Sequence, residues 1–102
     1  MKRDEILNYL KEFKQSSHNN IFTEIALFGS YARNQADAFS DIDVAVRVDG
    51  NYLKEHDVWD YFDAINEMKM NLLKRFNLQS DIFDLESSST LVEKIKKDLV
   101  YV

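Results

Sequence analysis

Alternating apolar residues in one short segment constrain this fold more than any other feature. Residues 41–48 alternate in character, so on a β-strand one face carries Ile42, Val44, Val46 and Val48. The other face carries Asp41, Asp43, Ala45 and Arg47. An earlier segment, 21–28, is rich in β-branched and aromatic residues and stops at Gly29-Ser30, which is typical of a strand that runs into a turn. The chain therefore predicts a sheet with two carboxylates at the start of one strand.

Segments with helical spacing flank these strands. Apolar residues recur every three or four positions in 3–17 and in 57–76, and the second segment is the longest predicted helix. The other expected elements are a short helix at 31–35, a turn at 49–51, a third strand at 80–85 and a closing helix at 89–100. The order α-β-(α)-β-α-β-α predicts an α/β (α+β) fold in which helices back a small sheet of about three strands.

Composition narrows the class of protein. With 102 residues, 45% of them apolar and 30% charged, the chain predicts one packed globular domain, 1–102. The formal net charge is -5 and the basic residues are scattered, which argues against nucleic acid as the main partner. The chain has no cysteine, no signal-peptide pattern at its start and no apolar run long enough to span a bilayer. We therefore expect a soluble, cytoplasmic protein without a membrane association.

The paired aspartates indicate a metal site. Asp41 and Asp43 project from the same face of the strand, roughly 7 Å apart along it. Leaving such a pair partly buried and unpaired would cost several kcal/mol. It would also raise the pKa of at least one carboxyl, because like charges disfavour each other's ionised form. A divalent cation removes that cost, and oxygen ligands favour magnesium or manganese. Because magnesium is usually held by one or two carboxylates together with phosphate oxygens, the pair predicts a polyphosphate substrate.

The Gly29-Ser30 turn supplies the complementary chemistry. Glycine permits positive φ or a close backbone approach, and the first amides of a following helix point at an anion. The hydroxyl of Ser30 can add a hydrogen bond to a phosphate oxygen.

A third carboxylate opens the last predicted strand. Asp81 could join the metal ligands or act as general base toward an incoming hydroxyl. Asp84 and Glu86 lie close by in sequence, so the third carboxylate is not fixed by spacing alone. Strand parity places Asp84 opposite to Asp81, which means that only one of the two can join the pair.

The motif Gly29-Ser30, ten residues, then Asp41-Ile42-Asp43 resembles the Gly-Ser-x10-Asp-x-Asp signature of the DNA polymerase beta-like nucleotidyltransferase superfamily. The segments FGSYAR, SDIDVAV, SDIFDL and IKKDLVYV extend the resemblance over about 21–102 to the minimal nucleotidyltransferase (MNT) family. Such domains are typically the antitoxin members of HEPN/MNT toxin–antitoxin pairs. In characterised pairs, the MNT member transfers AMP from ATP to a tyrosine of the HEPN ribonuclease and silences it.

The resemblance implies roles for individual residues. Gly29 and Ser30 become triphosphate contacts, and Asp41, Asp43 and Asp81 become catalytic metal ligands for two Mg²⁺ ions, with Mn²⁺ as an alternative. Arg33 lies just past the turn, where its guanidinium can reach a phosphate.

One position departs from the family pattern. Relatives commonly have glycine where this chain has Asn34. Because asparagine tolerates left-handed backbone better than most residues, we expect the turn to be kept.

The sequence leaves three functions open. The first is a magnesium-dependent nucleotidyltransferase that uses ATP or another nucleoside triphosphate to modify a partner HEPN toxin. Such an enzyme is expected to form a hetero-oligomer with the toxin, and a homodimer is the alternative assembly. The second is an antitoxin that binds nucleotide but neutralises its partner by steric blocking. The third is a small-molecule transferase of the aminoglycoside type, for which 102 residues leave little room to build an acceptor pocket.

Three aromatic residues crowd the start of the long predicted helix. They are Trp59, Tyr61 and Phe62, and a single helical stripe cannot bury all of them. Those that stay exposed are candidates for a partner surface.

Overall fold

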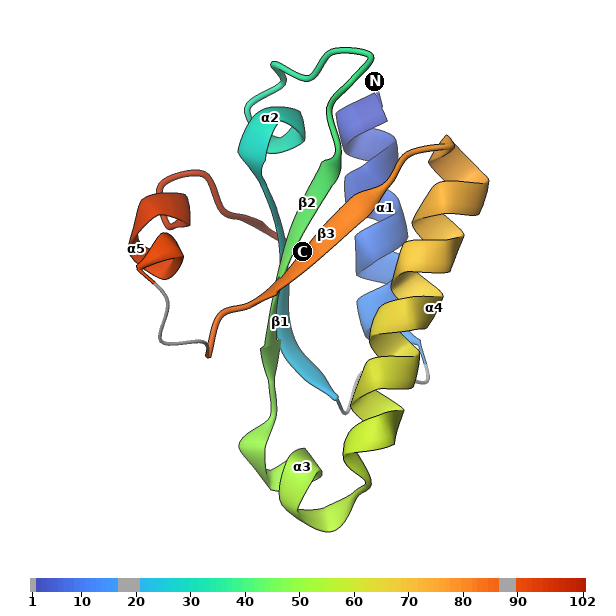
Figure 1. The fold of residues 1–102 in the computed structure, drawn as a ribbon, viewed down its shortest axis with the longest axis vertical. Helices are drawn as coiled ribbons and strands as arrows, with labels where there is room; N and C mark the ends of the chain where they lie inside the picture. Colours follow the sequence, from blue (N-terminus) through green and yellow to red (C-terminus); the bar gives the residue numbers. More distant parts are fainter. Residues whose placement is uncertain (1, 17–20, 87–89) are drawn as a thin grey trace.

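The sheet of this protein has four strands and is mixed (Figure 1). The structure is a computed structural model and describes residues 2–16, 21–86 and 90–102. Its strands are β1 (Phe22–Phe28), β2 (Ile42–Val48), β3 (Ser80–Asp84) and β4 (Val100–Tyr101). They lie in the order β3-β2-β1-β4, with β2 and β3 parallel and the other pairs antiparallel. The predicted α/β class is confirmed, with one strand more than the three expected.

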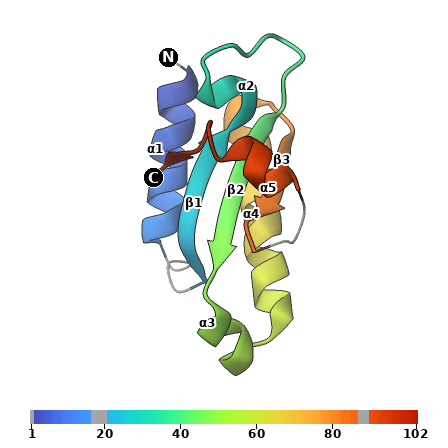
Figure 2. The same ribbon diagram turned by 90° about the vertical axis from the view of Figure 1, so that its left-hand side faces the viewer.

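Helices lie on both faces of this sheet (Figures 1 and 2). The long helices α1 (Lys2–Gln15) and α4 (Val58–Phe76) cover one face, and α5 (Leu91–Ile95) lies on the other. Two short helices sit at opposite ends of the molecule, α2 (Gly29–Ala32) after β1 and α3 (Gly50–Glu55) after β2. Among the described residues, no helix is long and apolar enough to cross a membrane.

The alternation of β2 creates two unequal apolar layers. Its residues Ile42, Val44, Val46 and Val48 are buried in the main core with residues of α1 and α4, as the pattern predicted. On the other face, Ala45 packs in a smaller cluster with Leu85 and Ile95. Asp43 shares that second face but lies near the start of the strand, where it is half-buried. The sheet is therefore buried on both faces at its centre, and its upper end is left for polar side chains.

Side-chain caps set the ends of the predicted helices. The carboxylate of Asp57 accepts the backbone N–H of Trp59 at 3.0 Å, which starts α4, and Asn77 ends it in a left-handed conformation at φ 55°. Asp49 accepts the N–H of Asn51 at 2.9 Å in the same way. The segment 49–51, predicted as a turn, is thus the cap and first turn of α3.

The C-terminal segment departs most from the prediction. A helix was expected over 89–100, but α5 ends at Ile95 and the chain then extends into β4. Leu27 and Val100 are register partners, as are Ala26 and Tyr101. Pairing with the open edge of β1 therefore overrides the helical spacing of this segment. The predicted helix ends at 17 and 89 lie outside the described residues.

The stability of the fold should depend on the layer between the sheet and the long helices. Leu72 of α4 is fully buried, so we expect Leu72→Ala to lower the free energy of unfolding by about 2–5 kcal/mol. The matched control is Phe39→Ala, because Phe39 is 94% exposed and should change stability by no more than about 0.5 kcal/mol. Urea unfolding followed by circular dichroism measures both, and equal losses would contradict this packing.

Candidate active site

Three strands bring the candidate residues to one end of the sheet. β1 ends there and passes into α2, while β2 and β3 both begin there (Figure 1). The antiparallel register pairs Phe28 with Asp43, and the parallel register pairs Asp43 with Asp81. Residues from three separate parts of the sequence are therefore side by side across neighbouring strands.

Gly29 lies directly against the carboxylate of Asp43. Its φ is +76°, a conformation that L-residues rarely adopt. A Cβ atom on Gly29 would overlap Oδ2 of Asp43 and lie 3.1 Å from its Cγ. The Gly-Ser turn and the Asp-x-Asp strand thus meet in van der Waals contact, which only glycine allows.

Ser30 follows in the first turn of α2 with unused polar groups. No side chain caps this turn at Phe28. Within the described residues, the hydroxyl of Ser30 makes no hydrogen bond, although its carbonyl accepts the N–H of Gln35 at 2.8 Å. Backbone N–H groups and a hydroxyl are therefore available beside Asp43 to bind an anion.

Negative charge accumulates around Asp43, which is half-buried between the exposed residues Asp41 and Asp81. Burial raises the pKa of the Asp43 carboxyl above its ordinary value, and the charges of Asp81 and then Asp41 raise it further. The guanidinium of Arg33 acts in the opposite direction and lowers this pKa. Asp43 is therefore the carboxylate on which the charges of its two neighbours act.

Asp81 and Asp84 lie on opposite faces of the sheet, as strand parity predicted. Asp84 is paired with the core residue Val46, and its charge acts on Tyr61 of α4, on the face away from Asp43. Its Oδ1 atom accepts the N–H of Glu86 at 2.8 Å. Glu86 itself is held by Arg47 at 2.6 Å. Asp81 is therefore the carboxylate of this group that lies beside Asp43.

The donor set fits a hard divalent cation shared with a phosphate ligand. Among the residues that the structure describes, no group of three or more carboxylate, histidine or cysteine side chains is placed to hold a metal ion, so Asp41, Asp43 and Asp81 do not form a ready three-carboxylate cluster. Magnesium at phosphoryl-transfer sites needs only one or two carboxylates, because substrate phosphates complete its coordination. The mutual repulsion at Asp43 is the cost that such an ion would remove.

Arg33 is held in place by a residue that the sequence analysis missed. Its Nη1 lies 2.8 Å from Oδ2 of Asp98, and its Nε donates to Oε1 of Gln35 at 3.0 Å. Asp98 reaches this position because β4 returns to pair with β1. The signal was available in the β-branched and aromatic residues of Val100-Tyr101-Val102, which favour a strand. Asn34 adopts φ 59°, so the expected left-handed turn is kept.

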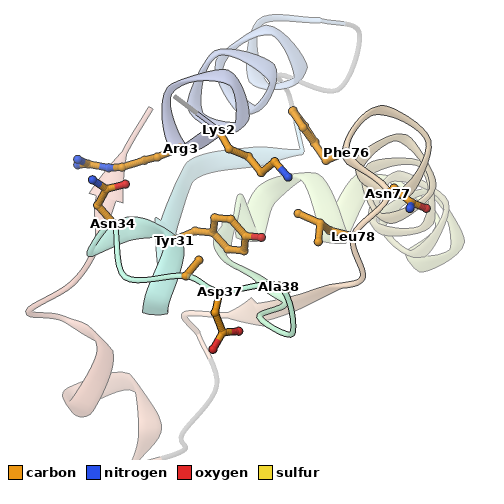
Figure 3. Close-up of a pocket in the computed structure, with 10 residues that line it drawn as sticks. Lys2, Arg3, Tyr31, Asn34, Asp37, Ala38, Phe76, Asn77 and Leu78 are labelled. Carbon is orange, nitrogen blue, oxygen red and sulfur yellow. The ribbon is translucent and has the colours of Figure 1, made fainter.

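A cavity of about 600 Å³ lies next to this site but does not contain the aspartates Asp41, Asp43 or Asp81. It is bounded by the start of α1, the segment after α2 and the end of α4 (Figure 3). Tyr31 from α2 and Lys2 from the start of α1 both line it. Burial raises the pKa of the Tyr31 hydroxyl, and the charges of Asp37 and Asp41 raise it further. Both aspartates lie in the loop between α2 and β2, which therefore joins the cavity to the candidate site.

The contact between Gly29 and Asp43 can be tested by adding one methyl group. Gly29→Ala should lower the free energy of unfolding by about 1–2 kcal/mol for the left-handed backbone alone, with a further loss because Asp43 must move. The control is Gly50→Ala, where a Cβ meets nothing within 4 Å and where alanine in a helix should be neutral or stabilising by about 0.4–1 kcal/mol. Equal unfolding midpoints in urea for the two variants would rule out the contact.

The charge of Asp43 should cost folding stability near neutral pH. Because the pKa of Asp43 is raised in the folded protein, the stability it contributes is present at low pH and is lost as the pH rises through that raised value. Asp43→Asn should therefore raise the melting temperature at pH 7, and the gain should shrink as the pH falls toward the ordinary pKa of aspartate. Thermal unfolding over a pH series measures this, with Asp84→Asn as the control on the other face. A lower melting temperature for Asp43→Asn at pH 7 would contradict the expected repulsion.

Comparison with known proteins agrees with the geometry of this site. The family model described as polymerase beta, nucleotidyltransferase, matches residues 6–102. A protein of Methanocaldococcus jannaschii named "Putative protein adenylyltransferase MJ1215" is 35% identical over 74 residues, which cover 70% of this chain and 86% of that protein.

Solved structures with the same fold include toxin–antitoxin proteins. One, described as a toxin-antitoxin with AMP-PNP, superposes with a TM-score of 0.61 at 25% identity over 92% of this chain and 69% of that one. Another, described as a mutant of the toxin-antitoxin MntA-HpeT, has a TM-score of 0.63 over the same shares at 21% identity and shows likeness of fold alone. The resemblance drawn from the Gly-Ser and Asp-x-Asp motifs is confirmed. The chain belongs to the polymerase beta nucleotidyltransferase family and is a nucleotidyltransferase.

Proposed function

We propose that this protein transfers AMP from ATP to a tyrosine hydroxyl of a partner HEPN toxin and thereby acts as an antitoxin. The contact between Gly29 and Asp43, with Asp81 on the adjoining strand, is the observation that carries the proposal. It puts amide and hydroxyl donors for phosphates beside carboxylates for a cation. The names of the relatives support the same direction, because one is called a protein adenylyltransferase and another is a toxin-antitoxin with a bound ATP analogue.

Each residue of the site has a part in this mechanism. The first amides of α2 and the hydroxyl of Ser30 bind the triphosphate, and Arg33 offers its guanidinium to a phosphate oxygen. Asp41 and Asp43, together with Asp81, would hold two Mg²⁺ ions. Mn²⁺ is the alternative metal. When bound, the ions neutralise the phosphate charge and polarise the α-phosphate.

Proton transfer falls to the carboxylate at the start of β3. Asp81 accepts the proton of the tyrosine hydroxyl as the oxygen attacks the α-phosphorus. A phosphorus–oxygen bond to tyrosine forms, the bond to the leaving oxygen breaks, and pyrophosphate departs. Inversion at phosphorus follows from this in-line displacement.

An exposed aromatic surface supports a protein partner. Trp59 is 66% exposed and lies 6.0 Å from the ring of the exposed Phe62. Both project from the acidic start of α4, near Asp60 and Asp63. Such a surface suits a partner with apolar and basic residues, and its own negative charge disfavours the alternative of a homodimer through this patch. The proposal therefore assumes a hetero-oligomer.

Steric neutralisation is the second candidate, and the same surface favours it. The start of α4 and the site at α2 lie at opposite ends of the molecule (Figure 1), so a partner could be bound without being modified. In both cases we take residues 1–102 as a single minimal nucleotidyltransferase domain in the cytoplasm, where a chain without cysteine needs no oxidising compartment.

The catalytic and steric proposals differ in what happens to the partner. The protein is incubated with the partner that co-purifies with it, Mg²⁺ and each nucleoside triphosphate, and the partner is weighed by intact mass spectrometry. Wild type should add AMP from ATP, Asp41→Asn/Asp43→Asn should add none, and Asp84→Asn should act as wild type because its carboxylate faces away.

Two results would overturn the catalytic proposal. One is AMP addition by the double variant at the wild-type rate. The other is full inhibition of the partner by wild type and double variant alike with no added nucleotide, which would establish the steric mechanism instead.

A further inference from the structure

The guanidinium of Arg33 is restrained but only partly used. Arg33 ends α2, and its Nη1 and Nε atoms donate to Asp98 at 2.8 Å and to Gln35 at 3.0 Å. A guanidinium has five N–H donors, so most of them stay available. Arg33 caps the short helix that begins at Gly29, and the backbone of Gly29 lies against the carboxylate of Asp43.

Asp98 is placed by the backbone on both sides. Its N–H donates to the carbonyl of Ile95 at 2.9 Å, which makes the turn after α5. Two residues later, Val100 is paired with Leu27 of β1. The turn after α5 and the start of β4 thus hold the backbone on either side of Asp98, and its carboxylate lies 2.8 Å from Nη1 of Arg33 at the end of α2.

The ion pair has little to contribute to folding. The side chains of Arg33 and Asp98 are 44% and 30% exposed, and exposed pairs are weak because water screens them. A free arginine side chain, however, has many rotamers. A ligand that must immobilise it binds more weakly, because the entropy lost by the side chain is subtracted from the binding free energy. A partner that restrains Arg33 beforehand removes this loss from the binding step.

We propose that Asp98 is a positioning residue for the donor nucleotide: it holds Arg33 so that the free N–H groups of the guanidinium face the phosphates. Gln35 is the second hold, at Nε. This inference rests on the proposed function, because it needs a polyphosphate at the Gly29-Ser30 turn. It assigns β4 a purpose, which is to carry Asp98 to α2.

Asp98 could instead weaken nucleotide binding, and the two roles predict opposite changes in affinity when its carboxylate is removed. Asp98 adds a further negative charge to a site that already contains Asp41, Asp43 and Asp81, and it competes with phosphate for Arg33. If competition dominated, removing the carboxylate would tighten nucleotide binding. If positioning dominates, removing it weakens binding.

The experiment measures the dissociation constant of Mg·ATP by calorimetry on the full chain. Asp98→Ala should raise it about three- to tenfold, the range expected when a rotamer-rich side chain must be ordered by the ligand. Asp98→Asn keeps a hydrogen-bond acceptor and should recover part of the affinity. In an Arg33→Ala background, Asp98→Ala should have no effect.

Two controls separate positioning from general damage. Glu12→Ala removes one carboxylate from another exposed arginine pair, with Arg75 at 3.5 Å, and should bind Mg·ATP as wild type does. The ¹⁵N relaxation of the Arg33 Nε–H group in the free protein should show greater mobility in Asp98→Ala than in wild type.

The outcomes are distinct. Tighter or unchanged binding by Asp98→Ala, or an equal loss in the Arg33→Ala background, overturns the positioning role while leaving the proposed function intact. Failure of the wild-type protein to bind Mg·ATP overturns the proposed function, and this inference with it.

Discussion

The site depends on one close approach, that of the Gly29 backbone to the Asp43 carboxylate. It requires the register that sets Phe28 opposite Asp43, and it requires a residue without a side chain at the end of β1. The positive φ of Gly29 then turns the chain into α2, so that amides and a hydroxyl face the same space as the carboxylate. A shift of one residue in the register would send Asp43 into the core and break the site, which makes strand pairing a functional constraint as well as a structural one.

This arrangement works against folding, and the rest of the sheet compensates. Asp43 is half-buried next to two other carboxylates, and both burial and repulsion disfavour its charged form. The centre of the same strands is buried on both faces, with Val44 and Val46 in the larger core and Ala45 in the smaller one. A strand that is firmly held along its middle can carry unfavourable charge at its end, because the apolar residues determine its register.

Local patterns were enough to predict most of the fold and the grouping of the aspartates. The alternation in 41–48 predicted the buried face, and parity predicted that Asp81 and Asp84 face opposite ways, although the preference for Asp81 came from the family resemblance. The errors lie where a local pattern met a distant partner. β4 has two residues and pairs with the free edge of β1, so the strand-favouring residues of Val100-Tyr101-Val102 are too few to predict it without that partner. The start of α3 resembles a turn in sequence because Asp49 caps a helix with the same residue types that make turns.

Arg33 shows why a short signature describes such a site incompletely. The Gly-Ser and Asp-x-Asp motifs are close in sequence, and a single β1–β2 pairing suffices to join them. The guanidinium of Arg33, which lies between the two motifs in the sequence, is bound by Asp98, 65 residues further along the chain. That contact joins segments far apart in the sequence, and β4 lies just after Asp98 and pairs with β1, so a long-range loop closure accompanies it. A chain could therefore keep every residue of the signature and still present its arginine differently, because the conformation of Arg33 is determined by the far end of the sequence.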